Sequence, residues 1–195
     1  MNLPLELWHY IFNYLNLRDQ LYYVRGVCRN WRDFVLYKRE LELTELLEQN
    51  INYKLLLLFD RETLKNLTIS RLDIEAKLVS KILRYYIKLE ELNLIDVSSC
   101  WSSFNNITRI KKLKKLNITS TSNIYGYQLF LIANECKKIE ELILCYKYIV
   151  TDKLLDMIFV SFYNLKLLDI RNCPNYDKKY IEIKMEEFPN IKVLY

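Results

Sequence analysis

The hydrophobic positions after residue 60 return at a nearly constant interval. The motif L-x-x-L-x-L, with other aliphatic residues allowed at the Leu positions, begins at Leu64, Leu89, Leu113, Ile139 and Leu165, and a truncated sixth copy runs from Ile191 to Leu194. Successive copies start 24 to 26 residues apart. A fixed period of this length predicts a solenoid, in which each repeat buries its apolar side chains only against its neighbours.

Each copy changes its hydrophobic period from that of a strand to that of a helix. After the strand motif, apolar residues follow at i, i+3, i+4 and i+7 in Val79-Ile82-Leu83-Tyr86, Leu129-Ile132-Ala133-Cys136 and Leu155-Ile158-Phe159-Phe162, and more weakly in Ile181-Met185-Phe188. In the second copy, residues 97–110 predict only a short helix or an irregular turn. The sequence therefore predicts an α/β fold, with parallel strands on the concave face and helices on the convex face.

The strand motif also predicts which side chains are available to a ligand. Because side chains alternate along a strand, motif positions one, four and six point into the core, and positions three, five, seven and eight face the concave surface. Since aromatic and Arg residues dominate interface energetics, we expect a protein cargo to bind there. The candidate anchors are Arg71, Ile95, Lys115, Ile143, Tyr146, Leu167 and Arg171. An ordinary solvated sheet would have a similar mixed composition.

The first forty residues follow a different pattern, that of three short helices. Their apolar stripes are Leu5-Trp8-Ile11-Phe12-Leu15, Leu17-Leu21-Val24 and Val27-Trp31-Phe34-Val35. Gly26 is expected to break the second helix before the third begins. Three helices of this size cannot bury all three stripes among themselves, so we expect apolar surface to remain for a partner.

The spacing of individual residues in this segment resembles the F-box. The matching residues are Leu3-Pro4, Glu6, Ile11-Phe12, Leu15, Asp19, Val27-Cys28 and Trp31, and the match over residues 2–36 has no gaps. The resemblance implies a three-helix module that binds the Skp adaptor of a Skp–cullin–F-box ubiquitin ligase. It maps adaptor contacts onto Leu3, Pro4, Ile11, Leu15, Val27, Cys28 and Trp31. The sequence alone does not divide these residues between contact surface and internal core.

The repeats resemble the cysteine-containing leucine-rich repeats typical of F-box proteins. Residues 149–155 carry the helix-entry signature, with Thr151 as the expected cap, and Cys173 stands at motif position nine, where that family places Cys or Asn. The other position-nine residues depart from the family pattern, and they are Leu72, Val97, Thr121 and Lys147.

These patterns divide the chain into residues 1–37 as an F-box, 38–60 as a mostly helical junction, and 61–195 as five repeats plus the truncated sixth. An irregular first repeat within the junction is an alternative. Few turn residues interrupt the junction, so a packed connection is expected rather than a loose linker. The last copy stops inside its strand at Tyr195, which predicts either an open sheet edge or a fragment of a longer array.

Composition narrows the chemistry that is expected. The 29 basic and 24 acidic residues are interspersed, unlike a nucleic-acid-binding footprint, and no apolar run is long enough to span a membrane. The five cysteines form no C-x-x-C pair, so we expect reduced thiols in the cytosol or nucleus. His9 is the single histidine and there are two glycines, which disfavours a zinc site, a catalytic triad or a phosphate-binding loop. No cofactor, metal or enzymatic activity is expected.

The leading hypothesis is therefore a substrate-recognition adaptor of a Skp–cullin–F-box E3 ligase. The F-box would bind the Skp-type adaptor, and through it the cullin–RING ligase, while the repeats would bind a protein cargo. One alternative is a binding protein that acts outside ubiquitination or as a decoy of ligase subunits. Another is a structural repeat protein whose helical start is only a cap.

Overall fold

A computed structural model describes Leu7, residues 11–12, 14–15, 19–36, 39–44, 58–70, 76–97, 104–121 and 124–195. Over these residues, the chain forms a parallel sheet of seven strands that lie side by side in chain order. The strands are β1 (Glu40–Thr44), β2 (Asn66–Ser70), β3 (Glu91–Ile95), β4 (Lys115–Asn117), β5 (Glu141–Ile143), β6 (Leu167–Asp169) and β7 (Lys192–Leu194). This arrangement is compatible with a repeat solenoid.

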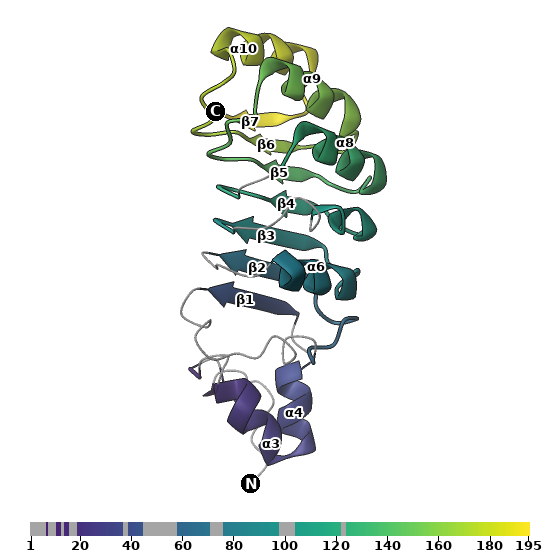
Figure 1. The fold of residues 1–195 in the computed structure, drawn as a ribbon, viewed down its shortest axis with the longest axis vertical. Coiled ribbons are helices and arrows are strands. Elements are labelled where there is room, and N and C mark those ends of the chain that lie inside the picture. Colours follow the sequence, from purple (N-terminus) through teal and green to yellow (C-terminus); the bar gives the residue numbers. More distant parts are fainter. Residues whose placement is uncertain are drawn as a thin grey trace.

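The helices of the repeats lie along one side of the sheet, and the N-terminal helices lie at one end of the stack (Figure 1). The repeat helices are α6 (Ala76–Tyr85), the 3₁₀ turn η3 (Ile107–Arg109), α8 (Gly126–Glu135), α9 (Asp152–Ser161) and α10 (Lys178–Glu187). The N-terminal elements are the π-helical η1 (Gln20–Val24), α3 (Arg25–Val27) and α4 (Arg29–Leu36).

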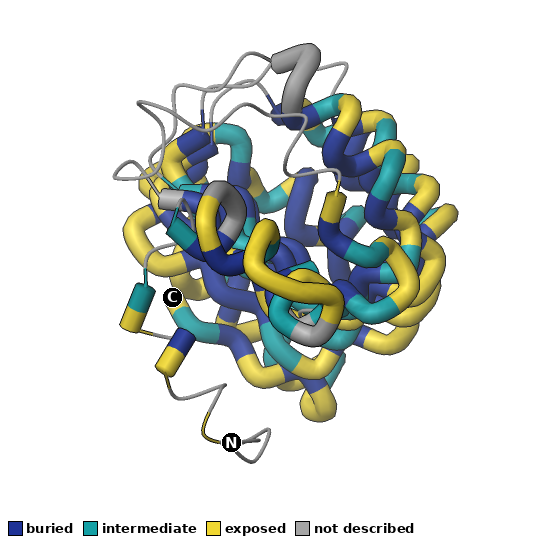
Figure 2. The backbone as a smooth tube through the Cα atoms, turned by 90° about the horizontal axis from the view of Figure 1, so that it is seen from below, coloured by how far each residue is buried: buried dark blue, intermediate teal, exposed yellow. Residues whose placement is uncertain are grey.

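The strand motif folds as its period predicts. Asn66 pairs with Glu91, and Glu91 pairs with Lys115, so equivalent motif positions lie next to each other across the sheet. In β2, Leu67 and Ile69 are fully buried while their neighbours are half-buried, which confirms the alternation of core and surface positions. Viewed along the stack, the buried positions line the interior between sheet and helices, and exposed positions lie outside (Figure 2).

The predicted helical stretches are also confirmed. The apolar residues predicted for α6, α8 and α9 are buried, whereas α10 buries Ile181 fully and its other two only partly. Thr151 caps α9 as expected, because its hydroxyl oxygen accepts a hydrogen bond from the Leu154 amide at 3.3 Å. In the second copy, η3 is the helical element among its described residues, in agreement with the weak pattern there.

The described part of the junction differs from the helical prediction and is compatible with the alternative of an irregular first repeat. Residues 40–44, expected to be mostly helical, form β1, which pairs with β2 in parallel from Glu40 with Asn66 to Thr44 with Ser70. Leu41 and Leu43 are buried in the core. The alternation E-L-E-L-T fits a strand, and pairing with β2 outweighs the helical preference of Glu and Leu. Residues 45–57 lie outside the described part of the chain, and the domain division stays a prediction.

Main-chain hydrogen bonds join the N-terminal helices to the sheet. The Asp60 amide donates to the Leu36 carbonyl at the end of α4, at 2.8 Å, and the Lys65 amide donates to the Arg39 carbonyl, also at 2.8 Å. Phe59 between them is fully buried. These contacts indicate a packed connection rather than a loose one.

Two details of the predicted elements are wrong. The second N-terminal helix does not break at Gly26, because α3 includes it and the chain becomes extended only at Cys28. In the last copy, Val193 rather than Leu194 pairs with Leu168 and is buried. The connection into β7 is one residue shorter than the motif spacing assumes, and this moves the buried position back by one.

The corner after each of the strands β3 to β6 has an unusual backbone. Motif position eight takes a left-handed conformation in Asp96, Ser120, Tyr146 and Asn172, with φ between 51° and 61°. Such a conformation is ordinary for Asn and Asp, but it is strained for a bulky residue such as Tyr146. The corner turns the chain back over the core, so the following residue points inward.

Motif position nine therefore forms a buried row. The Thr121 hydroxyl donates to the Leu94 carbonyl at 2.7 Å, and the Cys173 thiol donates to the Leu144 carbonyl at 3.1 Å. Each bond links one repeat to the strand before it. Lys147 occupies the same position between them with only 4% of its surface exposed, and its ammonium has no hydrogen-bond partner among the described residues.

Candidate protein-binding surfaces

The N-terminal helices expose a set of large apolar side chains. The exposed residues are Leu7, Ile11, Tyr14, Tyr23 and Val27. Val27 is the last residue of α3, and 59% of its surface is exposed. Tyr23 and Val27 stand four residues apart in consecutive helical segments, which places them on one face. A concentration of exposed apolar residues in so short a segment is typical of a partner-binding surface.

The predicted adaptor contacts divide into two groups. Ile11, Val27 and Cys28 are exposed, while Leu15 and Trp31 are half-buried and pack against the core. Trp31 lies edge-on to Phe12, with ring centroids 5.1 Å apart, so it supports the helices from inside. Leu3 and Pro4 lie outside the described residues. The adaptor-binding role of all seven stays a prediction.

Two exposed residues were missed by the sequence interpretation. Tyr14 follows Ile11 by three residues, and Tyr23 precedes Val27 by four. These helical spacings place them beside predicted contacts, so the periodicity was sufficient to find them. The F-box pattern does not identify them, because neither Tyr14 nor Tyr23 belongs to it.

The second candidate surface is the face of the sheet away from the helices, which we call the open face. It is formed by motif positions three, five, seven and eight. Among the predicted cargo residues, Ile95, Lys115, Ile143 and Leu167 are half-buried there, and Tyr146 and Arg171 are exposed. Ile143, Tyr146, Leu167 and Arg171 lie together on the neighbouring strands β5 and β6 and the corners after them. Arg71 lies outside the described residues.

Arg171 is held in place by its own strand. Its guanidinium donates to both carboxylate oxygens of Asp169, at 2.9 Å and 2.7 Å, while the Arg171 side chain stays 59% exposed. Burial alone would raise the pKa of Asp169, but hydrogen bonds from Arg171 and Cys145 outweigh it and lower that pKa. A bidentate pair fixes the guanidinium plane, so Arg171 is a rigid element of the open face.

Cys145 lies beside this pair and is poorly suited to nucleophilic chemistry. Burial, followed by its hydrogen bond to Asp169, raises the pKa of the Cys145 thiol to about 11. A thiol with so high a pKa is protonated near neutral pH and does not supply a reactive thiolate. The four described cysteines carry free thiols.

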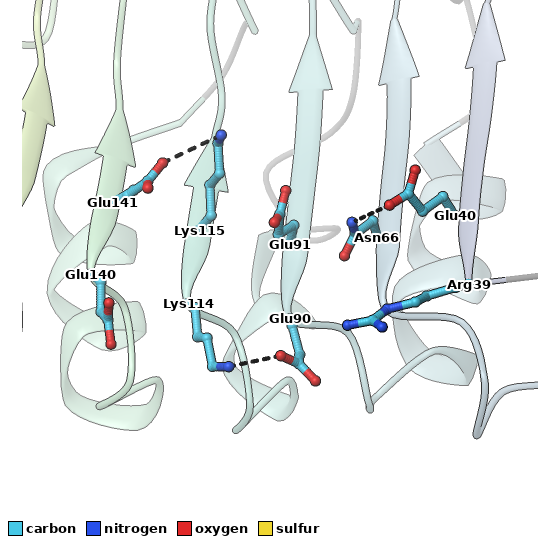
Figure 3. Close-up of a pocket in the computed structure, with 9 residues that line it drawn as sticks. All are labelled: Arg39, Glu40, Asn66, Glu90, Glu91, Lys114, Lys115, Glu140 and Glu141. Atoms are coloured by element: carbon cyan, nitrogen blue, oxygen red, sulfur yellow. Dashed lines mark hydrogen bonds and ion pairs between the residues drawn. The ribbon is translucent and has the colours of Figure 1, made fainter.

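Charged side chains line a hollow of about 360 Å³ where the strands β1 to β5 begin (Figure 3). Lys114 pairs with Glu90 at 2.8 Å, and Lys115 pairs with Glu141 at 3.3 Å. The hydrogen bond between Lys114 and Glu90 lowers the pKa of Glu90 and raises the pKa of Lys114. The acidic pairs at residues 90–91 and 140–141 lie where the chain enters β3 and β5, at the same place in two repeats.

The described residues contain no group of His, Cys, Asp and Glu side chains arranged to hold a metal ion. None of the described helices is both long and apolar enough to cross a membrane. His9 lies outside the described part of the chain.

Comparison with known protein families gives one match. The model of the F-box domain matches residues 1–42. The chain carries an F-box domain. The match covers the N-terminal elements and reaches into β1, so the exposed apolar residues of the first surface belong to this domain. No curated protein matches the chain. F-box domains typically bind Skp-type adaptors, and this gives the first surface a possible partner.

Proposed function

We propose that this protein is a substrate-recognition adaptor of a Skp–cullin–F-box ubiquitin ligase. The observation that carries the proposal is the F-box domain at residues 1–42, whose described helices leave Ile11, Tyr23 and Val27 exposed. When a partner covers exposed apolar side chains, the removal of their surface from water stabilises the complex. The partner proposed for this surface is a Skp-type adaptor, which links the chain to a cullin–RING ligase.

The open face is the proposed cargo-binding surface. Its clustered side chains on β5 and β6 include an aromatic residue, Tyr146, and a guanidinium that Asp169 holds in one orientation. Such groups dominate interface energetics because they contribute large contact areas at a small entropic cost. The proposal also includes the assignment of the sheet and its helices to the leucine-rich repeats, and a location in the cytosol or nucleus.

In this role the protein itself performs no chemistry. It would hold the cargo near the ubiquitin-carrying subunits of the ligase, so that the acceleration comes from proximity. The main-chain bonds between Asp60 and Leu36, and between Lys65 and Arg39, support such a role because they limit how far the two surfaces can move apart.

A pull-down with a Skp-type adaptor tests the first half of the proposal. Ile11→Glu with Val27→Glu places two charges on the exposed apolar surface of the F-box domain, and recovery of the adaptor is expected to fall at least tenfold. Val160→Glu on α9 is the matched control, since Val160 is at least as exposed as Ile11 and Val27 but lies among the repeats. Equal recovery with all three proteins would contradict the docking assignment.

Reconstitution of the ligase distinguishes the adaptor role from the alternative, because it measures adaptor binding and ubiquitin transfer separately. Ubiquitin transfer to a partner that co-purifies with the chain supports the adaptor role. Stable adaptor binding with no transfer to any such partner would favour the alternative, a binding protein that acts outside ubiquitination or as a decoy.

A further inference from the structure

The open face changes its charge along the stack of strands. On β1 to β3 and the corner after β3, each charged side chain at a described open-face position is acidic, and these residues are Glu40, Glu42, Glu91 and Asp96. From β4 onward, charges of both signs occur, and apolar residues such as Ile143 and Leu167 lie between them. Over its described residues, which do not include Arg71, the sheet therefore presents an acidic half, defined by those four residues, and a mixed half.

The nearest basic side chains do not neutralise the acidic half. Lys115 lies next to Glu91 across the sheet, but it is paired with Glu141 on its other side, at 3.3 Å. Glu91 thus has no ion pair among the described residues, although it lines the hollow (Figure 3). Among the described residues, Glu40 accepts a hydrogen bond only from the neutral amide of Asn66, at 3.0 Å.

Arg39 is the one further base in the lining of the hollow. It stands at the start of β1, and its charge helps to lower the pKa of Glu90, after Lys114 and burial have acted on that group. Figure 3 shows Arg39 directed toward Glu90 rather than toward Glu91. The carboxylates of Glu40 and Glu91 are therefore the groups of the hollow that remain to attract a cation.

The distance between these two carboxylates suits an extended chain. Glu40 and Glu91 lie in one row on β1 and β3, with Asn66 between them. Two strand spacings amount to about 10 Å. Residues three apart in an extended segment of polyproline II conformation lie about 9 Å apart and on the same face, because that conformation has three residues per turn. A segment that crosses the strands can thus place one basic residue on each carboxylate.

Uncharged polar side chains fill the space between the acidic ones. Asn93 donates one N–H to the Thr68 hydroxyl at 3.0 Å. An amide side chain has two donors and can accept twice, and the carbonyl oxygen and second N–H of Asn93 have no further partner among the described residues. These groups can bind the main chain of an extended ligand, which needs both donors and acceptors.

We propose that the acidic half binds an extended protein segment with two basic residues three positions apart. The segment continues over β5 and β6, where an apolar residue three positions further reaches Ile143 and Leu167. This inference rests on the proposed function, because it names the chemical class of the cargo that the adaptor would hold.

Fluorescence anisotropy with synthetic peptides tests the inference on the full chain bound to its Skp-type adaptor. The probe is a labelled peptide of Ser residues with Lys at two positions three apart and Leu three positions later. Comparison peptides carry Glu in place of Lys, or the two Lys residues next to each other. The Lys peptide is expected to bind at least tenfold more tightly than the Glu peptide, and more weakly as salt increases.

Two double variants locate the binding. Glu40→Gln with Glu91→Gln is expected to weaken binding of the Lys peptide about tenfold, since Gln keeps the hydrogen bond to Asn66 and loses the charge. Glu182→Gln with Glu186→Gln is the matched control on α10, where both carboxylates are exposed, and no change is expected.

Each contrary result has a distinct meaning. No binding of the Lys peptide, or equal loss with both double variants, overturns the assignment of a basic cargo to this surface. Equal binding of the peptide with adjacent Lys residues overturns the spacing. Since the Skp-type adaptor is present throughout, its retention shows that the proposed adaptor role stands even where the peptide assignment fails.

Discussion

The F-box domain and the repeats differ in how far they bury their apolar side chains. Among the described residues, the aliphatic motif positions of each repeat lie between the sheet and the helices. Leu92, Leu116 and Leu142 have no exposed surface there. The described N-terminal residues include three buried apolar side chains, Phe12, Val24 and Val35, and five large apolar residues that are exposed. The difference shows that the repeats bury their apolar residues against their neighbours in the chain, whereas the F-box domain leaves apolar surface that a partner could cover.

The largest expected effect comes from removing a core side chain of the repeats. Leu142→Ala at the centre of β5 is expected to lower the free energy of unfolding by about 2 to 5 kcal/mol, because it leaves a cavity between two repeats. Val27→Ala in the F-box domain is expected to change it by less than about 0.5 kcal/mol, since that side chain is already exposed. Urea unfolding of both variants measures the contrast, and similar losses for the two would show that Val27 is buried in solution.

Lys147 is an exception within the buried interior of the repeats. Burial lowers the pKa of its ammonium from 10.5 to about 8, and the nearby Cys173 opposes this only weakly. The folded protein therefore binds this proton less tightly than the unfolded chain does. The resulting penalty is fully present below pH 8 and disappears as the pH rises toward 10.5, so stability rises with pH across that window.

Lys147→Met removes the buried charge and is expected to raise the free energy of unfolding at pH 7 by as much as about 3 kcal/mol. Lys138→Met, at an exposed position, is the control and is expected to have little effect. The gain from Lys147→Met should shrink between pH 8 and pH 10. A gain that does not depend on pH would mean that the Lys147 ammonium reaches solvent or a hydrogen-bond partner.

The sequence predicts most of the repeat region, and the reasons for the exceptions are physical. Position nine was recognised from spacing, but nothing in the sequence shows that the corner backbone turns Lys147 inward. β1 was missed because five residues of alternating Glu and Leu also suit a helix, and only pairing with β2 decides between them. The acidic half of the open face could not be predicted for the same reason. Glu40 and Glu42 belong to that face only because β1 joins the sheet.

The F-box domain was predicted by a different route. Its exposed apolar residues were anticipated in general, because three short helices cannot bury three stripes. Which predicted contacts are exposed could not be derived, since Val27 and Trp31 belong to the same predicted stripe. The structure places Val27 at the end of α3, and it places Trp31 in α4, where its ring packs against Phe12. A repeating sequence gives several copies of each position to compare, and a single small domain gives one.

The hydrogen bonds of the position-nine row are expected to have a moderate effect. Thr121→Val keeps the shape of the side chain and removes its donor to the Leu94 carbonyl, so a loss of about 1 kcal/mol in unfolding free energy is expected. Thr108→Val in η3 is a suitable control, because its hydroxyl bonds only to the nearby Asn105 carbonyl. An equal loss in both variants would show that the bond between repeats adds nothing beyond a local one.

The smallest expected effect separates stability from binding at one residue. Tyr146 holds a left-handed backbone conformation with φ of 58°, although its side chain is 58% exposed and gains little by packing. Tyr146→Asn places at this corner a residue that accepts the conformation, as Asn172 does in the next repeat, and should raise the free energy of unfolding by roughly 0.5 kcal/mol. If Tyr146 anchors a cargo, the same substitution weakens cargo capture even though the protein becomes more stable. Thermal unfolding and a binding assay on the same preparation measure the two effects, and a variant that is more stable and binds equally well would remove Tyr146 from the cargo surface.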